Sequence, residues 1–375
     1  MNQRNFVVVL VLIVALLAGW MFYTSQQAVQ AEPIQEVTTK YWNSGHADAE
    51  SVAFTHWNED DPAEVPVACA RCHSSSGFRD LIGADGSEAG KVDMAGQIND
   101  PINCTACHND AAHALDSVTF PSGKEVTGTG ENSACMSCHG AMSAGTSVEA
   151  ATAGKEADTP IPDSSLINPH YFHAAAVHAG AEAGVGYQYE GKTYVGTFQH
   201  ADTVNSCTEC HDPHSLHTRE IPNSDASLCS TCHANVSGFA DYRTVNMSKV
   251  DYDGDGTVEP VYDEIEGVKV ILADALNKYS LATTETGFGF KLDSYPYGFI
   301  DTNKDGMIDE SEGIFPNKYA TFTPRMLKAS FNYMFVQKEP AAYLHNAKYV
   351  LQLMFDSIED LSSVSGVTTQ GLTRP

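Results

Sequence analysis

The stretch Cys104-Thr-Ala-Cys107-His108 is one of five Cys-x-x-Cys-His units that decide how this chain folds. All ten cysteines of the 375-residue sequence lie in these units. The other four units are Cys69-Ala-Arg-Cys72-His73, Cys135-Met-Ser-Cys138-His139, Cys207-Thr-Glu-Cys210-His211 and Cys229-Ser-Thr-Cys232-His233. Two thiols three residues apart can each bond one vinyl group of the same porphyrin, and the adjacent histidine then faces the iron. This is the attachment signature of c-type haem, so the sequence predicts five covalent haems.

Three other uses of paired cysteines fit the pattern less well. Structural disulfides suit an exported chain, but they give no reason for a histidine at the same offset in all five units. Zinc ribbons use paired Cys-x-x-Cys units, do not need the trailing histidine, and five units pair badly. A thioredoxin-like site has one such motif in a βαβ pattern. We therefore interpret the histidines of the units as proximal iron ligands: His73, His108, His139, His211 and His233.

Ten further histidines are available as second axial ligands. They concentrate around the motifs, whereas several of the ten methionines lie in the N-terminal apolar segment or in the C-terminal helical part. Ligation by two histidines is therefore predicted for most or all of the haems, and a methionine ligand would raise the potential. Residues 140–206 hold no motif but contain His170 and His200, so we expect this segment to wrap back over irons bound elsewhere.

The N-terminal segment, residues 1–31, predicts export. One basic residue, Arg4, precedes an uncharged run of 18 residues from Phe6 to Tyr23, and Val29-Gln30-Ala31 is an acceptable cleavage site. The run is also nearly long enough to span a bilayer as a helix. A cleaved signal peptide and an uncleaved membrane anchor both remain open. In either case the rest of the chain works in the periplasm or at the cell surface.

Beyond the motifs, the chain resembles exported multihaem (polyhaem) c-type cytochromes of bacteria that transfer electrons to extracellular acceptors. The resemblance extends over nearly all residues after 40 and is carried by passages such as SGHADAESVAFTHW, CARCHSSSGFRDLIGADG, NPHYFHAAAV and CTECHDPHSLH. It implies six better candidates for the distal iron ligands, one more than five irons need: His46, His56, His170, His200, His214 and His345. In this comparison His173, His178 and His217 are extra histidines, and His113 lies between the two groups.

Two acidic loops in the C-terminal part predict calcium binding. The first fits every position of the twelve-residue calcium loop, with Gly306 at the turn and Ile308 as the apolar residue. Its ligands would be Asp301, Asn303, Asp305, Met307 through its carbonyl, Asp309 and Glu312. The second loop is a poorer match, with Asp251, Asp253, Asp255 and Thr257 as candidates. Its position 12 is Tyr262, with Asp263 and Glu264 just beyond it, so we expect a displaced last ligand.

The predicted fold is mostly α with irregular segments. Residues 32–245 form the haem region, in which 165 residues from Cys69 to His233 hold five motifs, so the haems themselves must supply much of the core. Residues 246–375 form a helical region with EF-hand-like calcium loops, which packs on the haem region and supplies His345 as a ligand to one of its irons. Apolar spacing predicts helices over 264–279, from Pro324 to before Pro340, and over 341–361. The residues before Asp301 do not predict an entering helix.

The net charge of −27 argues against nucleic-acid binding, because phosphate would be repelled. The leading hypothesis is an electron carrier that exchanges electrons with other redox proteins or with acceptors in the periplasm or outside the cell. An enzyme is the less favoured alternative: a multihaem reductase of nitrite, hydroxylamine or a sulfur oxyanion, which needs one haem with an open site. A third hypothesis is a homo-oligomer or filament in which a neighbouring copy donates one distal histidine.

Overall fold

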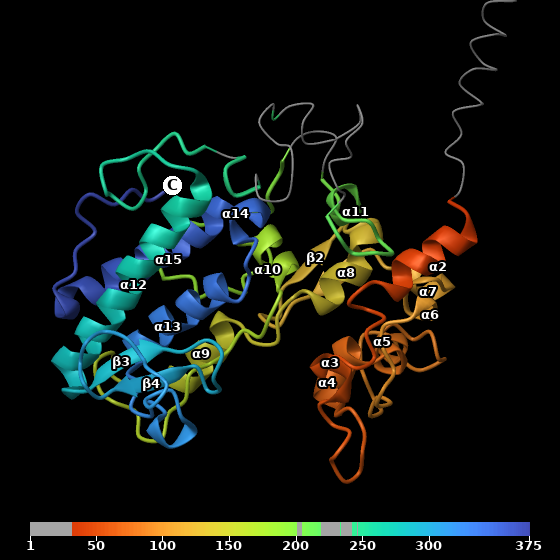
Figure 1. Cartoon of the computed structure of the whole chain (residues 1–375), viewed down its shortest axis with the longest axis horizontal. Coiled ribbons are helices and arrows are strands. Elements are labelled where there is room, and N and C mark those ends of the chain that lie inside the picture. The colour runs from red at the N-terminus through yellow and green to blue at the C-terminus, as the bar shows by residue number, and fades with distance from the viewer. Residues whose placement is uncertain (1–31, 201–204, 219–232, 234–241, 246) are drawn as a thin grey trace, which may run out of the picture.

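The computed structural model describes residues 32–200, 205–218, 233, 242–245 and 247–375. Within these residues the chain forms an elongated body with two halves, seen side by side in Figure 1. Among the described helices, none has the length and apolar character needed to span a bilayer. The predicted signal peptide or anchor, residues 1–31, lies outside the described residues, and so do Cys229 and Cys232 of the fifth motif.

The four motifs that the structure describes in full each form a short helix. These are α4 (Val67–His73), α6 (Cys104–Cys107), α8 (Ser133–Cys138) and α11 (Cys207–Cys210). Residues three apart in a helix lie on the same face, so both cysteines of a motif point to one side. Polar caps begin two of these turns: Asn103 accepts the N–H of Thr105, and Ser206 accepts that of Glu209.

The other elements before residue 261 are short, as expected of a region whose core is not built from protein alone. They are α2 (Ile34–Trp42), α3 (Val52–Thr55), α5 (Ser75–Leu81), α7 (Asp110–His113), α9 (Gly145–Thr152), α10 (Ala174–Ala179), the hairpin β1 (Ser117–Thr119) with β2 (Glu125–Thr127), and the 3-10 turn η1 (Gly130–Asn132). The last two of these helices, α9 and α10, lie beside the C-terminal helices (Figure 1). Helices of this length do not form alone in water and depend on tertiary contacts.

The second half is a compact helical unit. Its elements are α12 (Val261–Thr284), α13 (Pro324–Gln337), α14 (Ala342–His345), α15 (Ala347–Ser365), the hairpin β3 (Gly287–Phe290) with β4 (Gly298–Asp301), and the 3-10 turn η3 (Phe315–Asn317). The long helix α12 packs against both α13 and α15. The mostly α fold with irregular segments is thus confirmed. As predicted, no helix leads into the loop at Asp301; the chain there forms strand β4, which the sequence analysis did not predict.

The predicted helix over 341–361 is wrong in one respect, because it is broken at Asn346. The Asn346 side chain accepts the N–H of Tyr349 at 3.2 Å and so caps α15. Its amide nitrogen donates to the carbonyl of Gly196 at 3.0 Å and to that of His178 at 3.3 Å. These bonds to a distant segment turn the chain between α14 and α15 and fix the orientation of α14.

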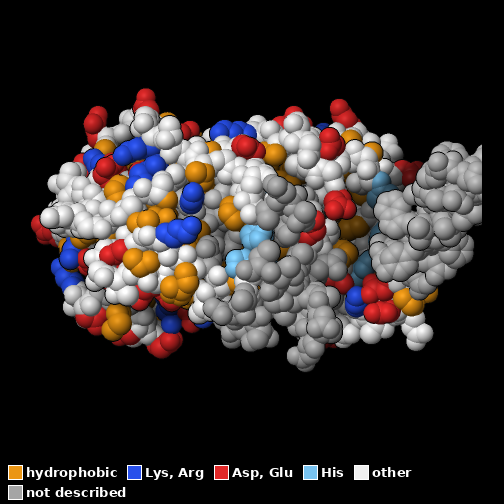
Figure 2. All heavy atoms as spheres, turned by 90° about the horizontal axis from the view of Figure 1, so that it is seen from above, with side chains coloured by type: hydrophobic (Ala, Val, Ile, Leu, Met, Phe, Trp, Pro, Cys, Tyr) orange, Lys and Arg blue, Asp and Glu red, His pale blue; other side chains and the backbone are white. Residues whose placement is uncertain are grey.

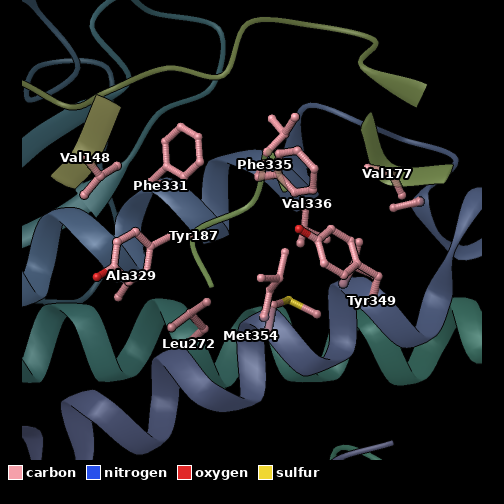
Figure 3. Close-up of a cluster of buried hydrophobic side chains, with 14 of the residues drawn as sticks. Val148, Val177, Tyr187, Leu272, Ala329, Phe331, Phe335, Val336, Tyr349 and Met354 are labelled. Carbon is pink, nitrogen blue, oxygen red and sulfur yellow. The ribbon is translucent and has the colours of Figure 1, made fainter. Parts of the chain in front are cut away.

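One hydrophobic core runs through both halves of the molecule. Val148 and Val177, from the segment between the third and fourth motifs, lie against Leu272, Tyr349 and other residues of the C-terminal helices (Figure 3). The core is completed by a buried polar contact between the same two parts of the chain, because Asn332 accepts the N–H of Tyr187 at 2.8 Å. The C-terminal helices are therefore packed directly on the segment that carries His170 and His178.

Candidate haem sites

The thiols of different motifs lie against one another. The Cys72 thiol donates to the Cys138 carbonyl at 3.8 Å, and the Cys138 thiol donates to the Arg71 carbonyl at 3.4 Å. The thiol of Cys138 also hydrogen-bonds that of Cys72 and lowers its pKa, which favours the thiolate, the reactive form of cysteine. The first motif therefore lies next to the third.

The third motif also contacts the fourth. The thiols of Cys135 and Cys207 hydrogen-bond each other, and the Asn132 side chain accepts the N–H of Cys207 at 2.9 Å. Burial raises the pKa of Cys107 in the second motif, and the nearby thiols of Cys135 and Cys104 raise it further. Three other motifs thus surround the third.

A pair of imidazoles on one metal ion has a recognisable geometry. When two imidazoles bind from opposite sides with nitrogen–metal distances of about 2.0 Å, their ring centroids lie about 6 Å apart. His73 and His170 have centroids 5.8 Å apart, and those of His46 and His139 are 6.4 Å apart. In each pair one histidine belongs to a motif and the other lies outside it, so both pairs have the spacing of axial ligands.

His108 of the second motif has two neighbours at the same spacing. His214 lies 6.1 Å away with its ring within 15° of parallel, and His113 lies 6.1 Å away with its ring at 80°. His113 is on α7, directly after the motif, whereas His214 follows the fourth motif. Of the two, only His214 was among the candidates that the family resemblance implies.

The fifth motif has a partner at the same spacing. His233 and His200 have ring centroids 6.1 Å apart, which places His200 at the fifth motif. Burial lowers the pKa of His211 in the fourth motif, the hydrogen bond to the Leu216 carbonyl opposes this, and electrostatic interaction with His345 and with His139 lowers the pKa further. His345 ends α14, which packs on α10. Histidine side chains reach the surface in the middle of the molecule in Figure 2.

Hydrogen bonds fix the tautomer of three proximal histidines. Nδ1 of His73 donates to the Ala53 carbonyl at 2.8 Å, that of His139 to Phe172 at 2.7 Å, and that of His211 to Leu216 at 3.1 Å. A carbonyl can only accept, so the proton lies on Nδ1 and the lone pair on Nε2. This is the tautomer that binds a metal through Nε2 with the other nitrogen held by the protein. These residues fit an iron ligand.

Other histidines are held in ways that do not suit ligation. His173 is fully buried, donates from Nε2 to the Phe335 carbonyl at 2.7 Å, and stacks on the Phe335 ring. The ring of His178 hydrogen-bonds the backbone of His345. His217 is exposed. His56, one of the six candidates, packs edge-on against Trp57, and its charge only slightly affects His73.

The two predicted calcium loops have the same internal hydrogen bonds. Asp301 accepts the N–H of Gly306 at 2.8 Å, as Asp251 accepts that of Gly256 at 2.9 Å. The later positions of the two loops also match. Asn303 accepts the N–H of Asp305, and Asp253 accepts that of Asp255. Asp305 then accepts the N–H of Met307, and Asp255 accepts that of Thr257. The two segments therefore share one loop conformation although their sequences match the pattern unequally.

The loops are closed by buried glutamates. Glu312 accepts the backbone N–H groups of Thr302 and Asp309, and Glu264 accepts those of Tyr252 and Glu259 in the same way. Carboxylate oxygens of Asp251, Asp253 and Glu264 lie within 4.8 Å of one another. Glu264 lies two positions after the last ligand of the twelve-residue calcium loop. The sequence pattern could therefore name it only as one of two acidic residues beyond the loop.

Comparisons with known proteins find similar sequences among c-type cytochromes. A family model described as cytochrome c7 and related cytochrome c matches residues 52–140, which hold the first three motifs. The chain is similar to "C-type polyheme cytochrome OmcC" of Geobacter sulfurreducens (strain ATCC 51573 / DSM 12127 / PCA), with 26% identity over 381 residues, which cover 84% of this chain and 45% of that protein. "C-type polyheme cytochrome OmcB" of Geobacter sulfurreducens (strain DL-1 / KN400) is 23% identical over 404 residues, which cover 91% and 50%.

The chain spans about half the length of these relatives. No solved structure matches it. The resemblance predicted from the sequence is confirmed: the chain is similar to polyhaem c-type cytochromes, and its first three motifs match the cytochrome c7 model.

Proposed function

We propose that this chain is an electron-transfer cytochrome that would hold five c-type haems, each through two cysteines and two histidines. When bound, haem iron supplies one-electron redox chemistry. The proposal rests on the pairing of imidazoles, because a second ring faces each of four proximal histidines at the spacing of axial ligands. For the fifth proximal histidine, His211, the partner His345 is inferred from the family resemblance, and His345 is one of the groups that interact with His211 electrostatically.

In this proposal each motif takes its distal ligand from a distant part of the chain. The pairs are His73 with His170, His108 with His214, His139 with His46, His211 with His345, and His233 with His200. His56 is the candidate left over. One half of the molecule then cannot hold all its haems without the other, because His345 comes from the C-terminal helices.

The motif contacts support a connected path for electrons. The thiols of the third motif lie against those of the first and fourth, and each cysteine would join its haem at the porphyrin edge. The attachment points of these three haems are therefore adjacent. We assign the third motif to the middle of the path, with the second beside it.

The reductase alternative is not favoured. It requires one iron with an open or weakly held sixth position. Once the pairs above are assigned, none of the five irons lacks a second histidine. Electron transfer without a change of ligands is the function that this arrangement suits.

Calcium would hold the C-terminal loops in this proposal. Both loops present oxygen donors in the order that Ca²⁺ requires, and a buried glutamate closes each of them. Glu264 takes the place of the bidentate last ligand in the loop that begins at Asp251. The role of calcium would be structural. One ion would link the loop at Asp301 to β4, the other would link the loop at Asp251 to the start of α12, and each would neutralise the carboxylates of its loop.

The setting of the protein is part of the proposal. We infer an exported cytochrome of the periplasm or cell surface, whose partners are other redox proteins or extracellular acceptors. Membrane anchoring through residues 1–31 and assembly into an oligomer or filament stay open. The uncharged run from Phe6 to Tyr23 and the family resemblance support this setting.

Two measurements on the oxidised, full-length protein test the function. Intact mass should show five haem additions, one for each motif. The EPR and optical spectra should show low-spin haems alone, and nitrite, hydroxylamine and tetrathionate should neither bind nor turn over. Fewer than five additions in a host able to mature them, or a high-spin signal with turnover of one of these compounds, would overturn the proposal.

A further inference from the structure

Glu339 is a buried carboxylate next to the proposed distal ligand of the fourth motif. It follows α13 and is 3% exposed. Its Oε1 accepts a hydrogen bond from Nδ1 of His345 at 3.1 Å and another from the N–H of Ala341 at 3.2 Å. The carboxylate therefore holds the imidazole on the side away from Nε2, which stays available as the ligand atom.

This contact differs from those of the proximal histidines. His73, His139 and His211 donate from Nδ1 to neutral backbone carbonyls, whereas His345 donates to a negative charge. A carboxylate that accepts this hydrogen bond makes the ring a stronger donor to its metal. A stronger donor favours the ferric state, and axial ligation is one of the means by which a protein sets a haem potential.

Among the described residues, His345 is the side chain that hydrogen-bonds Glu339, and His173 interacts with this carboxylate only electrostatically. The neighbouring Lys338 directs its ammonium group to the rings of Tyr171 and Tyr297, at 4.2 and 3.9 Å from their centroids. His173 donates to the Phe335 carbonyl instead. Burying a carboxylate is costly unless it is paired, and within the part of the chain that the structure describes the second oxygen of Glu339 is buried without a hydrogen-bond partner. A neutral acceptor would hold the His345 ring at a lower desolvation cost. Orientation of the ring alone therefore does not explain why the acceptor is a carboxylate.

We propose that Glu339 is a positioning residue that orients His345 and lowers the reduction potential of the haem at the fourth motif below the value that a neutral acceptor would give. The inference rests on the proposed function, since it requires His345 to be the distal ligand of the iron at His211. The haem that links the two halves of the molecule would thus be tuned by a residue of the C-terminal half.

The test is a spectroelectrochemical titration of the full-length holoprotein carrying Glu339→Gln. The variant should retain five low-spin haems, and one of them should move to a higher potential. Asp356→Asn is the matched control, because Asp356 is also a buried carboxylate of this half but pairs with Arg374 at 2.8 Å. It should leave all the haem potentials unchanged. A Glu339→Gln titration that matches the parent protein would overturn the proposal.

Two further variants separate this inference from the ligation on which it rests. His345→Ala should convert one haem to high spin with all five still attached. If it does so while Glu339→Gln has no effect, the tuning role fails and the ligation stands. If His345→Ala keeps the parent spectrum and potentials, the ligation fails as well. Should Glu339→Gln not accumulate, Glu339→Asp should shift the EPR g-values of a single low-spin haem, and unchanged g-values overturn the proposal.

Discussion

The imidazoles of His46 and His139 stack with centroids 6.4 Å apart and planes 23° from parallel, although 93 residues separate them in the sequence. His139 belongs to the third motif, and His46 precedes the first. Burial and the charge of His139 lower the pKa of His46 to about 4, so this ring is neutral at physiological pH, as a metal ligand must be. The N-terminal segment therefore reaches the centre of the proposed electron path.

Replacement of His46 tests this relationship. In His46→Ala one iron should lose a strong axial ligand, so about one haem in five should become high spin in the EPR spectrum and its potential should rise. The matched control is His56→Ala, because His56 lies in the same N-terminal segment but packs on Trp57. It should leave the spectrum unchanged. A high-spin signal from the His56 variant instead of the His46 variant would reverse the assignment.

The second motif offers a choice between two imidazoles at the same distance. We expect His214 rather than His113 to be the distal ligand, because the family resemblance implies His214, whereas His113 lies on α7 directly after the motif; both rings lie 6.1 Å from that of His108. His214→Ala should give one high-spin haem, and His113→Ala should keep all the haems low spin. EPR of the two oxidised variants decides between them, and the opposite pattern would assign the site to His113.

The calcium loops predict a stability effect that depends on metal. Glu312→Gln and Glu264→Gln should each lower the melting temperature in excess calcium, and the difference from the parent should shrink in chelator, because the bidentate ligand has been removed. The loss at saturating calcium should be about 2 kcal/mol or more of unfolding free energy. The control is Glu310→Gln, which alters an exposed acid of the same loop that pairs with Lys291.

The outcome that would contradict the calcium assignment is equally direct. If chelator leaves the melting curve of the parent protein unchanged, neither loop binds calcium with structural effect. If only Glu312→Gln responds to metal, the displaced ligand Glu264 is excluded and the loop at Asp251 is an acidic turn held by its own hydrogen bonds.

Local patterns in the sequence predicted the parts of the site that are local in the structure. The spacing of the cysteines indicates which residues share a helical turn. The loop that begins at Asp301 fits the twelve-residue calcium pattern at every position. The pairing of imidazoles could not be predicted, because nothing near His46 encodes that it faces His139. Asn346 shows the same limit. It fits a helical pattern, so the sequence did not predict that its side chain caps α15 and hydrogen-bonds the carbonyl of Gly196, 150 positions earlier in the chain.

His173 predicts how stability depends on acid. Burial lowers its pKa to about 4, against about 6.5 in an unfolded chain, so the folded state binds fewer protons than the unfolded state between these values. The contribution of the neutral His173 ring to the free energy of unfolding is complete above about pH 6.5. It is lost as the pH falls toward about 4, and the total loss is about 3 kcal/mol. His173→Gln cannot be protonated there and can still donate toward the Phe335 carbonyl. The parent should therefore lose more stability than the variant between pH 7 and 4.5 in denaturant unfolding, and a difference that stays constant across this range would show that His173 is not buried in its neutral form.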